Sequence, residues 1–196
     1  VLTLWCTYFF RNPERITPAL SGTNKNNLII SPADGRVIEI SKVVPAEEIG
    51  LPEGDWTRIC VFMNVFDVHV NRSPMSGIIS YKKYIPGAFL NASLDKASSD
   101  NERLILGMDT ENGKKIAFVQ IAGLVARRII CDVDIGSTLK SGDIFGLIRF
   151  GSRVDIYFPS DASTMVLVGQ KMIAGETIIA DFTKSSKSVK KNTDDK

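Results

Sequence analysis

The chain has 196 residues, of which 44% are hydrophobic and 23% are charged, and its formal net charge is +2 at pH 7. These values are ordinary for a soluble globular protein, and the length is enough for one domain with its own hydrophobic core. The small net charge gives no case for nucleic-acid binding, which requires a concentrated basic face.

Cysteine and histidine are scarce in this chain. Cys6, Cys60 and Cys131 are widely spaced, odd in number and form no CxxC pair. This pattern fits a reducing compartment and argues against a disulfide framework or a structural zinc site. His69 is the single histidine. A transition-metal site would therefore need mostly carboxylate ligands, and we expect no metal.

Residues 1–10 are apolar and aromatic, and Arg11 ends the run. The run is too short to cross a bilayer, which needs about 20 residues. Two interpretations stay open: a first element docked on the core, or an interfacial contact with Trp5 and Tyr8 at a membrane surface. Residues 12–27 are polar and contain proline, so we expect a connector there.

From residue 28 onward, short β-branched runs alternate with turn residues, and no segment carries sustained helical periodicity. Asn112-Gly113 predicts a tight hairpin, and residues 91–103 are typical of a loop or a short helix. The expected strand segments are 28–40 with a turn at 32–35, 56–70, 76–84, 104–108, 115–121, 124–133, 144–150, 154–158 and 166–180 with an internal turn. This predicts a mainly β fold, barrel-like or sandwich-like, with few short helices. We expect a single domain over residues 1–182 and a polar, disordered tail over residues 183–196.

Gly151 and Ser152 interrupt two strand-like runs, residues 144–150 and 154–158. A Gly-Ser pair packs poorly within a strand, so the simple interpretation is a bulge or a tight corner at which glycine supplies unusual backbone angles. Composition alone favours that interpretation. The alternative is that Ser152 is a nucleophile at a point where the backbone can be strained.

His69 is the candidate general base for such a nucleophile, because it alone has an unperturbed pKa near neutrality. A lone histidine in a strand is nevertheless more often structural. Asp34 lies in the turn at residues 31–35, where Asp-Gly is ordinary turn chemistry. In a serine triad its carboxylate would instead orient His69, which would take the proton of Ser152. The G-x-S-x-G elbow of many serine hydrolases is absent.

A serine directly after glycine permits a different first step. The Ser152 hydroxyl can attack the Gly151 carbonyl, because glycine presents no side chain and tolerates strained angles. The resulting ester can eliminate to dehydroalanine, which hydrolyses to a pyruvoyl group and ammonia. The chain would then be cut between Gly151 and Ser152.

A series of motifs, each weak alone, is specific in combination and in order. They are YFFRNPER (residues 8–15), SPADGR (31–36), FMNVFDVHVNR (62–72) with Pro74 and Gly77, NER (101–103), GLVARR (123–128) and FGLIRFGSRVD (145–155). On these motifs the chain resembles the phosphatidylserine decarboxylases in their short bacterial form. The resemblance covers nearly everything from Tyr8 to Ala180.

The resemblance implies a proenzyme that cuts itself between Gly151 and Ser152. The products would be a β chain of residues 1–151 and an α chain of residues 152–196, which remain partners in one enzyme. Ser152 would become a covalent pyruvoyl group, which is the only cofactor that the resemblance implies. No metal is implied.

The family's Asp-His-Ser self-cleavage triad maps onto Asp34, His69 and Ser152. In the mature enzyme the amine of phosphatidylserine would form a Schiff base with the pyruvoyl group, lose carbon dioxide and leave as phosphatidylethanolamine. His69 is then the candidate proton donor. Some longer members carry a second histidine at the position of Phe66, so roles of that histidine do not transfer.

A lipid substrate implies a membrane surface as a partner. The resemblance places the protein at the bacterial cell membrane, on the cytoplasmic face, either peripheral or anchored through its N-terminus. Residues 5–10 then become an interfacial contact, and Arg127 and Arg128 could meet a phosphate or form ordinary surface pairs. A homo-oligomer is compatible with the sequence. Lysines that could add attraction to anionic lipid are Lys184, Lys187, Lys190 and Lys191.

Two alternatives from other classes stay open. Residues 168–180 look like the terminal hairpin of a lipoyl or biotinyl barrel, and residues 32–37 look like its opening strand, although Lys171 is poorly placed for a carrier lysine. We interpret this as a barrel-like topology with lipoyl- or biotinyl-like hairpins, since fold analogy does not carry the function of a carrier or binding module. The second alternative is a serine hydrolase that uses the same triad without self-cleavage.

Overall fold

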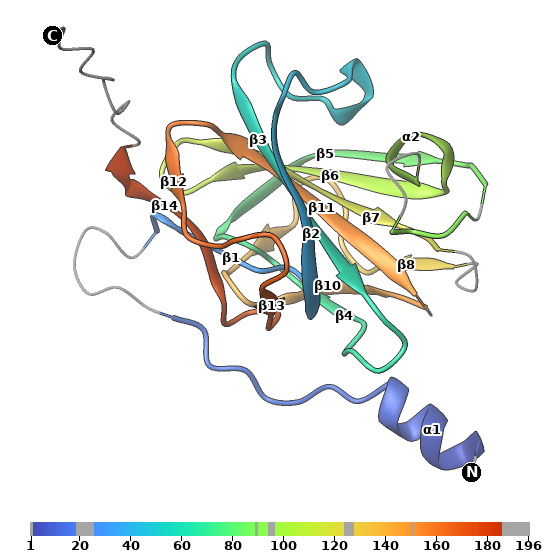
Figure 1. Ribbon diagram of the computed structural model, residues 1–196. Helices are drawn as coiled ribbons and strands as arrows, with labels where there is room; N and C mark the ends of the chain where they lie inside the picture. The colour runs from blue at the N-terminus through green and yellow to red at the C-terminus, as the bar shows by residue number, and fades with distance from the viewer. Residues whose placement is uncertain are drawn as a thin grey trace, which may run out of the picture.

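The structure is a computed structural model that describes residues 2–18, 26–88, 90–93, 97–123, 128–149 and 151–185. Within these residues the chain is mainly β, as predicted (Figure 1). Strand β14 (Ile178–Ser185) runs past residue 182, at which the domain was expected to end. Residues 186–196, which make up most of the expected tail, and Arg127 lie outside the described residues.

One large antiparallel sheet organises the molecule. Its strand order is β13-β2-β3-β11-β7-β6-β5-β9, and every neighbouring pair is antiparallel. The strands are β2 (Gly35–Val43), β3 (Trp56–Met63), β5 (Gly77–Ile85), β6 (Arg103–Thr110), β7 (Lys115–Ile121), β9 (Thr138–Leu139), β11 (Ser152–Pro159) and β13 (Lys171–Met172). The hairpin predicted at Asn112-Gly113 is confirmed, because it joins β6 to β7.

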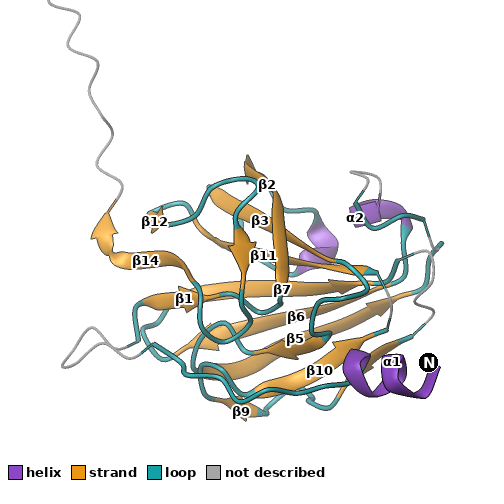
Figure 2. Cartoon of the chain, turned by 60° about the horizontal axis from the view of Figure 1, so that its bottom comes forward, coloured by secondary structure: helices purple, strands orange, loops and turns teal. Residues whose placement is uncertain are grey.

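Two three-stranded sheets complete the fold. One has the order β1-β14-β12, with β1 (Leu28–Ile30) and β12 (Ala162–Thr164) on either side of β14. The other has the order β4-β10-β8, formed by β4 (Val70–Arg72), β10 (Ile144–Ile148) and β8 (Ile129–Cys131). The large sheet curls, and the smaller sheets lie across its concave side (Figures 1 and 2). The barrel-like architecture expected from the spacing of the strands is thereby confirmed.

The concave side of the large sheet holds the main hydrophobic core. Phe118 of β7 packs on Phe145 of β10 with ring centroids 4.9 Å apart, so the large sheet and the β4-β10-β8 sheet share one interior. On β11 the alternate residues Val154, Ile156 and Phe158 enter this core and are fully buried. Truncating a core phenylalanine such as Phe158 to alanine costs about 3–5 kcal/mol.

The opposite face of β11 is buried as well. Tyr157 joins a second apolar cluster with Ile49, Trp56, Ile105 and Val119 among its members. A central strand that is covered on both faces is held by side-chain packing on each side and by backbone bonds along both edges. This makes β11 a rigid support for its first residue, Ser152.

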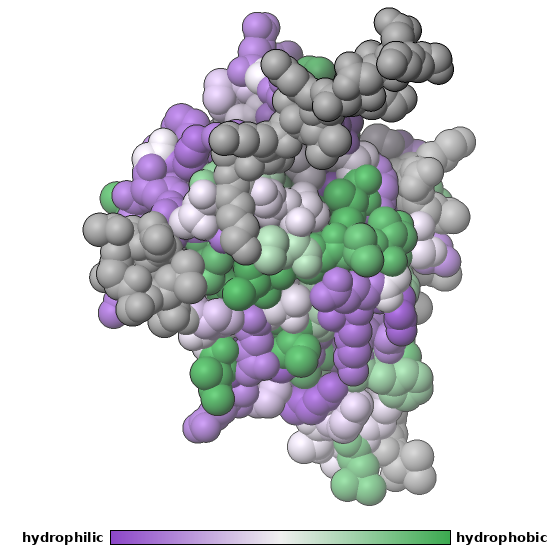
Figure 3. All heavy atoms as spheres, turned by 60° about the vertical axis from the view of Figure 1, so that its left-hand side comes forward, coloured by the Kyte–Doolittle hydropathy of each residue, from purple (hydrophilic) through white to green (hydrophobic). Residues whose placement is uncertain are grey.

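The helices in the described part of the chain are short. They are α1 (Leu2–Phe9), α2 (Ala97–Asp100) and the 3-10 helix η2 (Glu47–Ile49). Helix α1 lies outside the sheets, near the end at which β4 and β10 lie (Figures 1 and 2). Among the described residues, no helix has both the length and the apolar character needed to cross a membrane. On the face shown in Figure 3, apolar side chains form separate patches between polar ones.

The continuous strand predicted over residues 56–70 is wrong. Strand β3 ends at Met63, and β4 begins only at Val70. Between them the Asn64 side chain accepts from the Phe66 amide at 2.8 Å, and the Asp67 carboxylate accepts from the Asn64 amide at 2.9 Å. These local bonds compete with a strand ladder and form a turn. His69 therefore follows a turn and precedes β4.

The corner predicted at Gly151 is confirmed. Strand β10 ends at Ile148 in the small sheet, and β11 begins at Ser152 in the large sheet. Gly151 lies between them with φ of +62°, in the left-handed region that suits glycine. The chain thus crosses from one sheet to the other at the Gly151-Ser152 peptide.

Candidate active site

His69 is buried with one ring face covered. Its side chain is 2% exposed, and its ring centroid lies 4.2 Å from that of Phe9 at the end of α1. Its Nδ1 lies 3.0 Å from the main-chain carbonyl of Asp67. A carbonyl oxygen only accepts hydrogen bonds, so Nδ1 carries the hydrogen and Nε2 carries the lone pair.

The environment of His69 favours the neutral ring. Burial is the main cause, and it lowers the pKa of His69 from 6.5 to about 4. The hydrogen bond to Asp67 and the charge of Asp34 raise this pKa, whereas the charge of Arg11 lowers it. At pH 7 the imidazole is therefore a neutral base with a free lone pair on Nε2. That atom is buried and has no hydrogen-bond partner within the described chain.

Ser152 is the first residue of β11 and is completely buried. Its Oγ also lacks a hydrogen-bond partner within the described chain. A buried hydroxyl without a partner carries a desolvation cost of about 1–3 kcal/mol, so its persistence calls for a functional explanation. Two such atoms, Ser152 Oγ and His69 Nε2, are thus held away from water without being satisfied.

The structure brings His69 and Ser152 to the same end of the large sheet. Met63 lies opposite Ser152 in the β3-β11 register, and its Sδ lies 3.7 Å from the Asn71 side-chain nitrogen. Asn71 follows His69 closely in the chain, and the His69 carbonyl accepts from the Ile148 amide just before the corner. The two side chains form no hydrogen bond with each other. Catalytic hydrogen bonds are often long before the reactive geometry forms.

Asp34 lies close to this region but is engaged elsewhere. Both of its carboxylate oxygens accept from a single Arg15 nitrogen, Nη2, at 3.0 and 2.9 Å, and Oδ1 also accepts from the Ala174 amide at 2.7 Å. None of its described hydrogen bonds goes to His69. The turn that carries Asp34 packs on β4, where the Arg72 amide donates to the Pro32 carbonyl at 2.9 Å. Asp34 thus acts on His69 through its charge, while the Asp67 carbonyl holds Nδ1.

A buried ion pair holds the start of β11 in place on the face of the large sheet opposite Ser152. The Arg153 and Asp155 side chains are each 1% exposed and lie 2.7 Å apart. Arg153 also donates to the Ala92 carbonyl at 3.3 Å. Breaking a buried pair of this kind typically costs about 3–5 kcal/mol. The backbone next to Ser152 is therefore firmly placed.

Sequence reasoning missed several residues of this region. It did not connect Phe9 or the Asp67 carbonyl with His69. It also missed the fully buried amide pair Asn71 and Gln120, in which Gln120 donates to Asn71 at 2.9 Å. The signal for Gln120 was a single polar residue inside the apolar run 116–121. The Phe66 side chain, at the position of the second histidine of longer members, is 63% exposed.

The described residues named for other roles, Lys171 and Arg128, are exposed, and Lys171 lies near enough to Asp67 for its charge to act on that carboxylate. Lys171, the carrier candidate, is exposed in the two-residue strand β13, and Arg128 is exposed before β8. No group of three or more histidine, cysteine, aspartate or glutamate side chains suited to a metal ion occurs in the described part of the chain. Its three cysteines, Cys6, Cys60 and Cys131, are free thiols.

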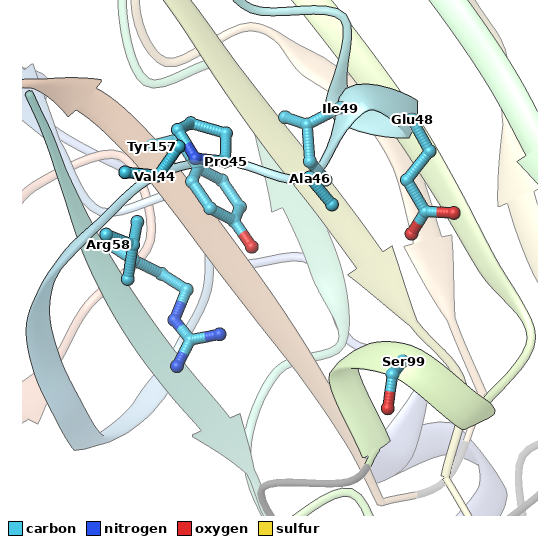
Figure 4. A pocket seen from close by; sticks show the side chains of 9 residues that line it. Val44, Pro45, Ala46, Glu48, Ile49, Arg58, Ser99 and Tyr157 are labelled. Carbon is cyan, nitrogen blue, oxygen red and sulfur yellow. The ribbon is translucent and has the colours of Figure 1, made fainter. Parts of the chain in front are cut away.

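A cavity of about 250 Å³ opens on the outer face of the large sheet. Tyr157 and Arg58 line it from β11 and β3, while Ala46 and Glu48 line it from the region of η2 (Figure 4). Residues separated by an odd number along a strand face opposite sides. Tyr157 therefore points away from the face that carries Ser152. This cavity does not include His69, Asp34 or Ser152.

Comparison with known proteins identifies the family. The family model for phosphatidylserine decarboxylase matches residues 2–180. The chain is 58% identical over 181 residues to a phosphatidylserine decarboxylase proenzyme of Ruegeria pomeroyi, covering 92% of this chain and 80% of that protein. It is 55% identical over 183 residues to the proenzyme of Cereibacter sphaeroides (93% and 77%). It is 53% identical over 182 residues to that of Rickettsia bellii (93% and 77%). The family expected from the motifs is confirmed, and the chain belongs to the phosphatidylserine decarboxylases.

Proposed function

We propose that the chain is a proenzyme that cuts itself between Gly151 and Ser152 and then decarboxylates phosphatidylserine to phosphatidylethanolamine. Family membership makes it a carboxy-lyase. The observation that carries the site assignment is the pair of buried, unpartnered atoms, Ser152 Oγ and His69 Nε2, at a corner where the backbone is left-handed.

In the first step His69 Nε2 takes the proton of Ser152 Oγ, and Oγ adds to the Gly151 carbonyl carbon. The bond between that carbon and the Ser152 nitrogen then breaks, and the nitrogen leaves as an amine after taking the proton back from His69. The product is an ester between Gly151 and the Ser152 side chain. Glycine at the corner leaves the carbonyl unobstructed.

Asp34 supports the protonated state of His69 in this step. When His69 holds two protons it carries a positive charge in a buried position, which is unfavourable. The negative charge of Asp34 raises the pKa of His69 and so reduces that cost. The Asp67 carbonyl keeps Nδ1 oriented throughout. Asp34, His69 and Ser152 thus form the proposed triad, with Asp34 acting through its charge.

The second step removes the Cα proton of Ser152 and breaks its Cβ–Oγ bond, so that Gly151 leaves as a carboxylate. The remaining dehydroalanine tautomerises, and water replaces its nitrogen, which leaves as ammonia. Ser152 has then become a pyruvoyl group at the start of the α chain, residues 152–196. The β chain, residues 1–151, ends in the Gly151 carboxylate.

The start of β11 suits such a covalent group. Residue 152 is buried, and its strand is paired with β3 on one side and β7 on the other. When formed, the pyruvoyl carbonyl supplies an electrophilic centre for the substrate's amine and an acceptor for the electron pair that carbon dioxide leaves behind. His69 Nε2, at the same end of the sheet, is the candidate atom for moving a proton to the substrate carbon.

We further propose a peripheral location on the cytoplasmic face of the bacterial membrane. Leu4, Tyr8 and Phe10 of the N-terminal segment are 76%, 47% and 48% exposed, and Phe66 is 63% exposed. Arg11 connects the N-terminal segment with the turn that carries Phe66, because it donates to the Phe66 carbonyl at 2.8 Å and lies over the Tyr8 ring. Within this apolar group the Phe10 ring contacts Phe9, whose own ring covers His69. A lipid surface would bury this group.

Mass spectrometry and a decarboxylation assay test the proposal. The purified wild-type protein should yield two fragments, with an α chain whose N-terminus is blocked by pyruvoyl. It should release carbon dioxide from phosphatidylserine vesicles, and reduction with borohydride should abolish that release. Folded Ser152→Ala and His69→Ala proteins should stay at full length. Efficient cleavage of His69→Ala would remove His69 from the triad. An intact chain with a modified Lys171 would instead indicate a carrier module. An intact and unmodified chain would indicate a serine hydrolase.

A further inference from the structure

Gly123 lies against the carbonyl group that self-cleavage would attack. It follows β7, is buried, and faces the Gly151 carbonyl across the corner. A Cβ atom added at Gly123 would lie 1.7 Å from the Gly151 oxygen and 2.8 Å from the Gly151 carbonyl carbon. Real Cβ atoms essentially never approach other atoms within 3.0 Å. No side chain therefore fits between Gly123 and this carbonyl.

The requirement for glycine at this position is spatial. Unlike Gly151, Gly123 does not have a positive φ in the left-handed region, so an alanine could adopt its backbone conformation. The obstacle is the close approach of the Gly151 carbonyl, together with the Ala92 Cβ at 3.3 Å on another side. An added methyl group would have to displace one of its neighbours.

The backbone on the N-terminal side of Gly123 is held firmly. The Ala122 amide donates to the Glu102 carbonyl at 2.9 Å, and the Ala122 carbonyl accepts from the Asn101 side chain at 2.7 Å. Asn101 is fully buried and also bonds to both main-chain groups of Leu90, at 3.0 and 2.8 Å. Because these bonds hold the backbone before Gly123 in place, a methyl group added at Gly123 would displace the Gly151 carbonyl instead.

We propose that Gly123 is a positioning residue for self-cleavage, which sets where the Gly151 carbonyl lies relative to Ser152 Oγ. The inference rests on the proposed cut between Gly151 and Ser152. Attack requires a short approach of Oγ to the carbonyl carbon along a defined direction, and a displacement of about 1 Å can reduce such a rate about 10²-fold. The clash at 1.7 Å requires a displacement of that size.

The test compares Gly123→Ala with Gly77→Ala. Gly77 also has an ordinary φ, and a Cβ there would lie 2.4 Å from the Asp109 carbonyl oxygen, so the control also carries a backbone clash, a milder one. It lies in β5, in contact with β6 and β9. Cleavage of each purified proenzyme is followed by mass spectrometry, and folding by near-UV circular dichroism. We expect Gly77→Ala to cut within a few-fold of the wild-type rate and Gly123→Ala to cut about 100-fold more slowly.

Two further measurements separate positioning from a general structural defect. Hydroxylamine rapidly cuts an ester, so over the time in which it cuts the wild-type ester it should release almost no fragment ending at Gly151 from folded Gly123→Ala, in which the first step is slowed. In the fraction that does mature, Gly151 is a free carboxylate that can shift away. Decarboxylation per pyruvoyl group, counted with a carbonyl reagent, should therefore match the wild type. An equal loss of cleavage rate and of activity per pyruvoyl would overturn the proposal.

A double variant covers the case in which Gly123→Ala does not fold. Ala92→Gly combined with Gly123→Ala removes one of the crowding atoms, and its folded form should cut at a rate between those of Gly123→Ala and the wild type. Wild-type cleavage by either folded variant would refute the role of Gly123 while leaving the proposed function intact. A wild-type protein that is not cut at Gly151-Ser152 would refute both.

Discussion

Replacing Phe9 with alanine is expected to raise the pKa of His69, because the Phe9 ring covers one face of the imidazole. The rings lie 4.2 Å apart, and burial lowers the pKa of His69 from 6.5 to about 4. Opening one of the two ring faces to water should restore roughly half of that shift. We therefore expect the pKa to rise by about one unit, equivalent to about 1.4 kcal/mol.

The chain offers a clean assay, since His69 is its only histidine. A proton NMR titration of the imidazole Cε1–H in Ser152→Ala protein, purified without a histidine tag, follows a single signal. Leu4→Ala is the matched control, because Leu4 lies on the same helix and is 76% exposed. A midpoint near 6.5 in the parent protein would refute the burial of His69. An equal midpoint in the Phe9→Ala and Leu4→Ala proteins would refute the covering role of Phe9.

The same shift makes stability depend on pH. Because the folded-state pKa of His69 is depressed, its stabilising contribution is complete above about pH 6.5 and is lost as the pH falls through about 4. The full shift corresponds to roughly 3 kcal/mol. Urea unfolding of Ser152→Ala protein at pH 7 and pH 4.5 should show this loss, and the loss should be smaller after Phe9→Ala.

Three other substitutions test separate parts of the site. Asp34→Asn should lower the pKa of His69 further, by removing the negative charge that raises it, and should destabilise the fold by about 1–3 kcal/mol; NMR and urea unfolding measure the two effects. Gly151→Asn should still cut, because a Cβ there meets no described atom within 4 Å and asparagine tolerates the left-handed region; an uncut chain on a gel would contradict this. Phe66→Asp should weaken sedimentation with phosphatidylserine vesicles several-fold without changing cleavage, whereas the control Ile135→Asp, at a residue 64% exposed, should leave sedimentation unchanged.

The fold class followed from the sequence, but the turn before His69 did not. Val65, Phe66 and Val68 are residue types that favour strands, so the hydrophobic pattern extended the strand through them. What ends β3 is a set of side-chain bonds to the main chain at Asn64 and Asp67. Such bonds are decided by a few polar atoms and leave almost no trace in the spacing of apolar residues.

The candidate site was predicted in part. Ser152 and His69 stood out because their residue types carry the chemistry, and the structure places both in buried positions; the triad itself stays a prediction. The contacts of Phe9 with His69 and of Gly123 with Gly151 join positions far apart in the chain. No local pattern encodes them. In the sequence Gly123 was only the first residue of the motif GLVARR. Its role could be inferred only once the position of the Gly151 carbonyl was known.

The position of β11 in the middle of the large sheet has a thermodynamic consequence for the mature enzyme. A cut before Ser152 would leave β11 paired with β3 and β7, which belong to the other chain, and would leave β14 paired with β1. The two chains would then form one sheet without a covalent link, and unfolding would become a dissociation. The proenzyme would refold by a unimolecular reaction, whereas the mature enzyme would have to reassemble from two molecules. Its melting temperature would therefore rise with protein concentration, unlike that of the uncut Ser152→Ala chain.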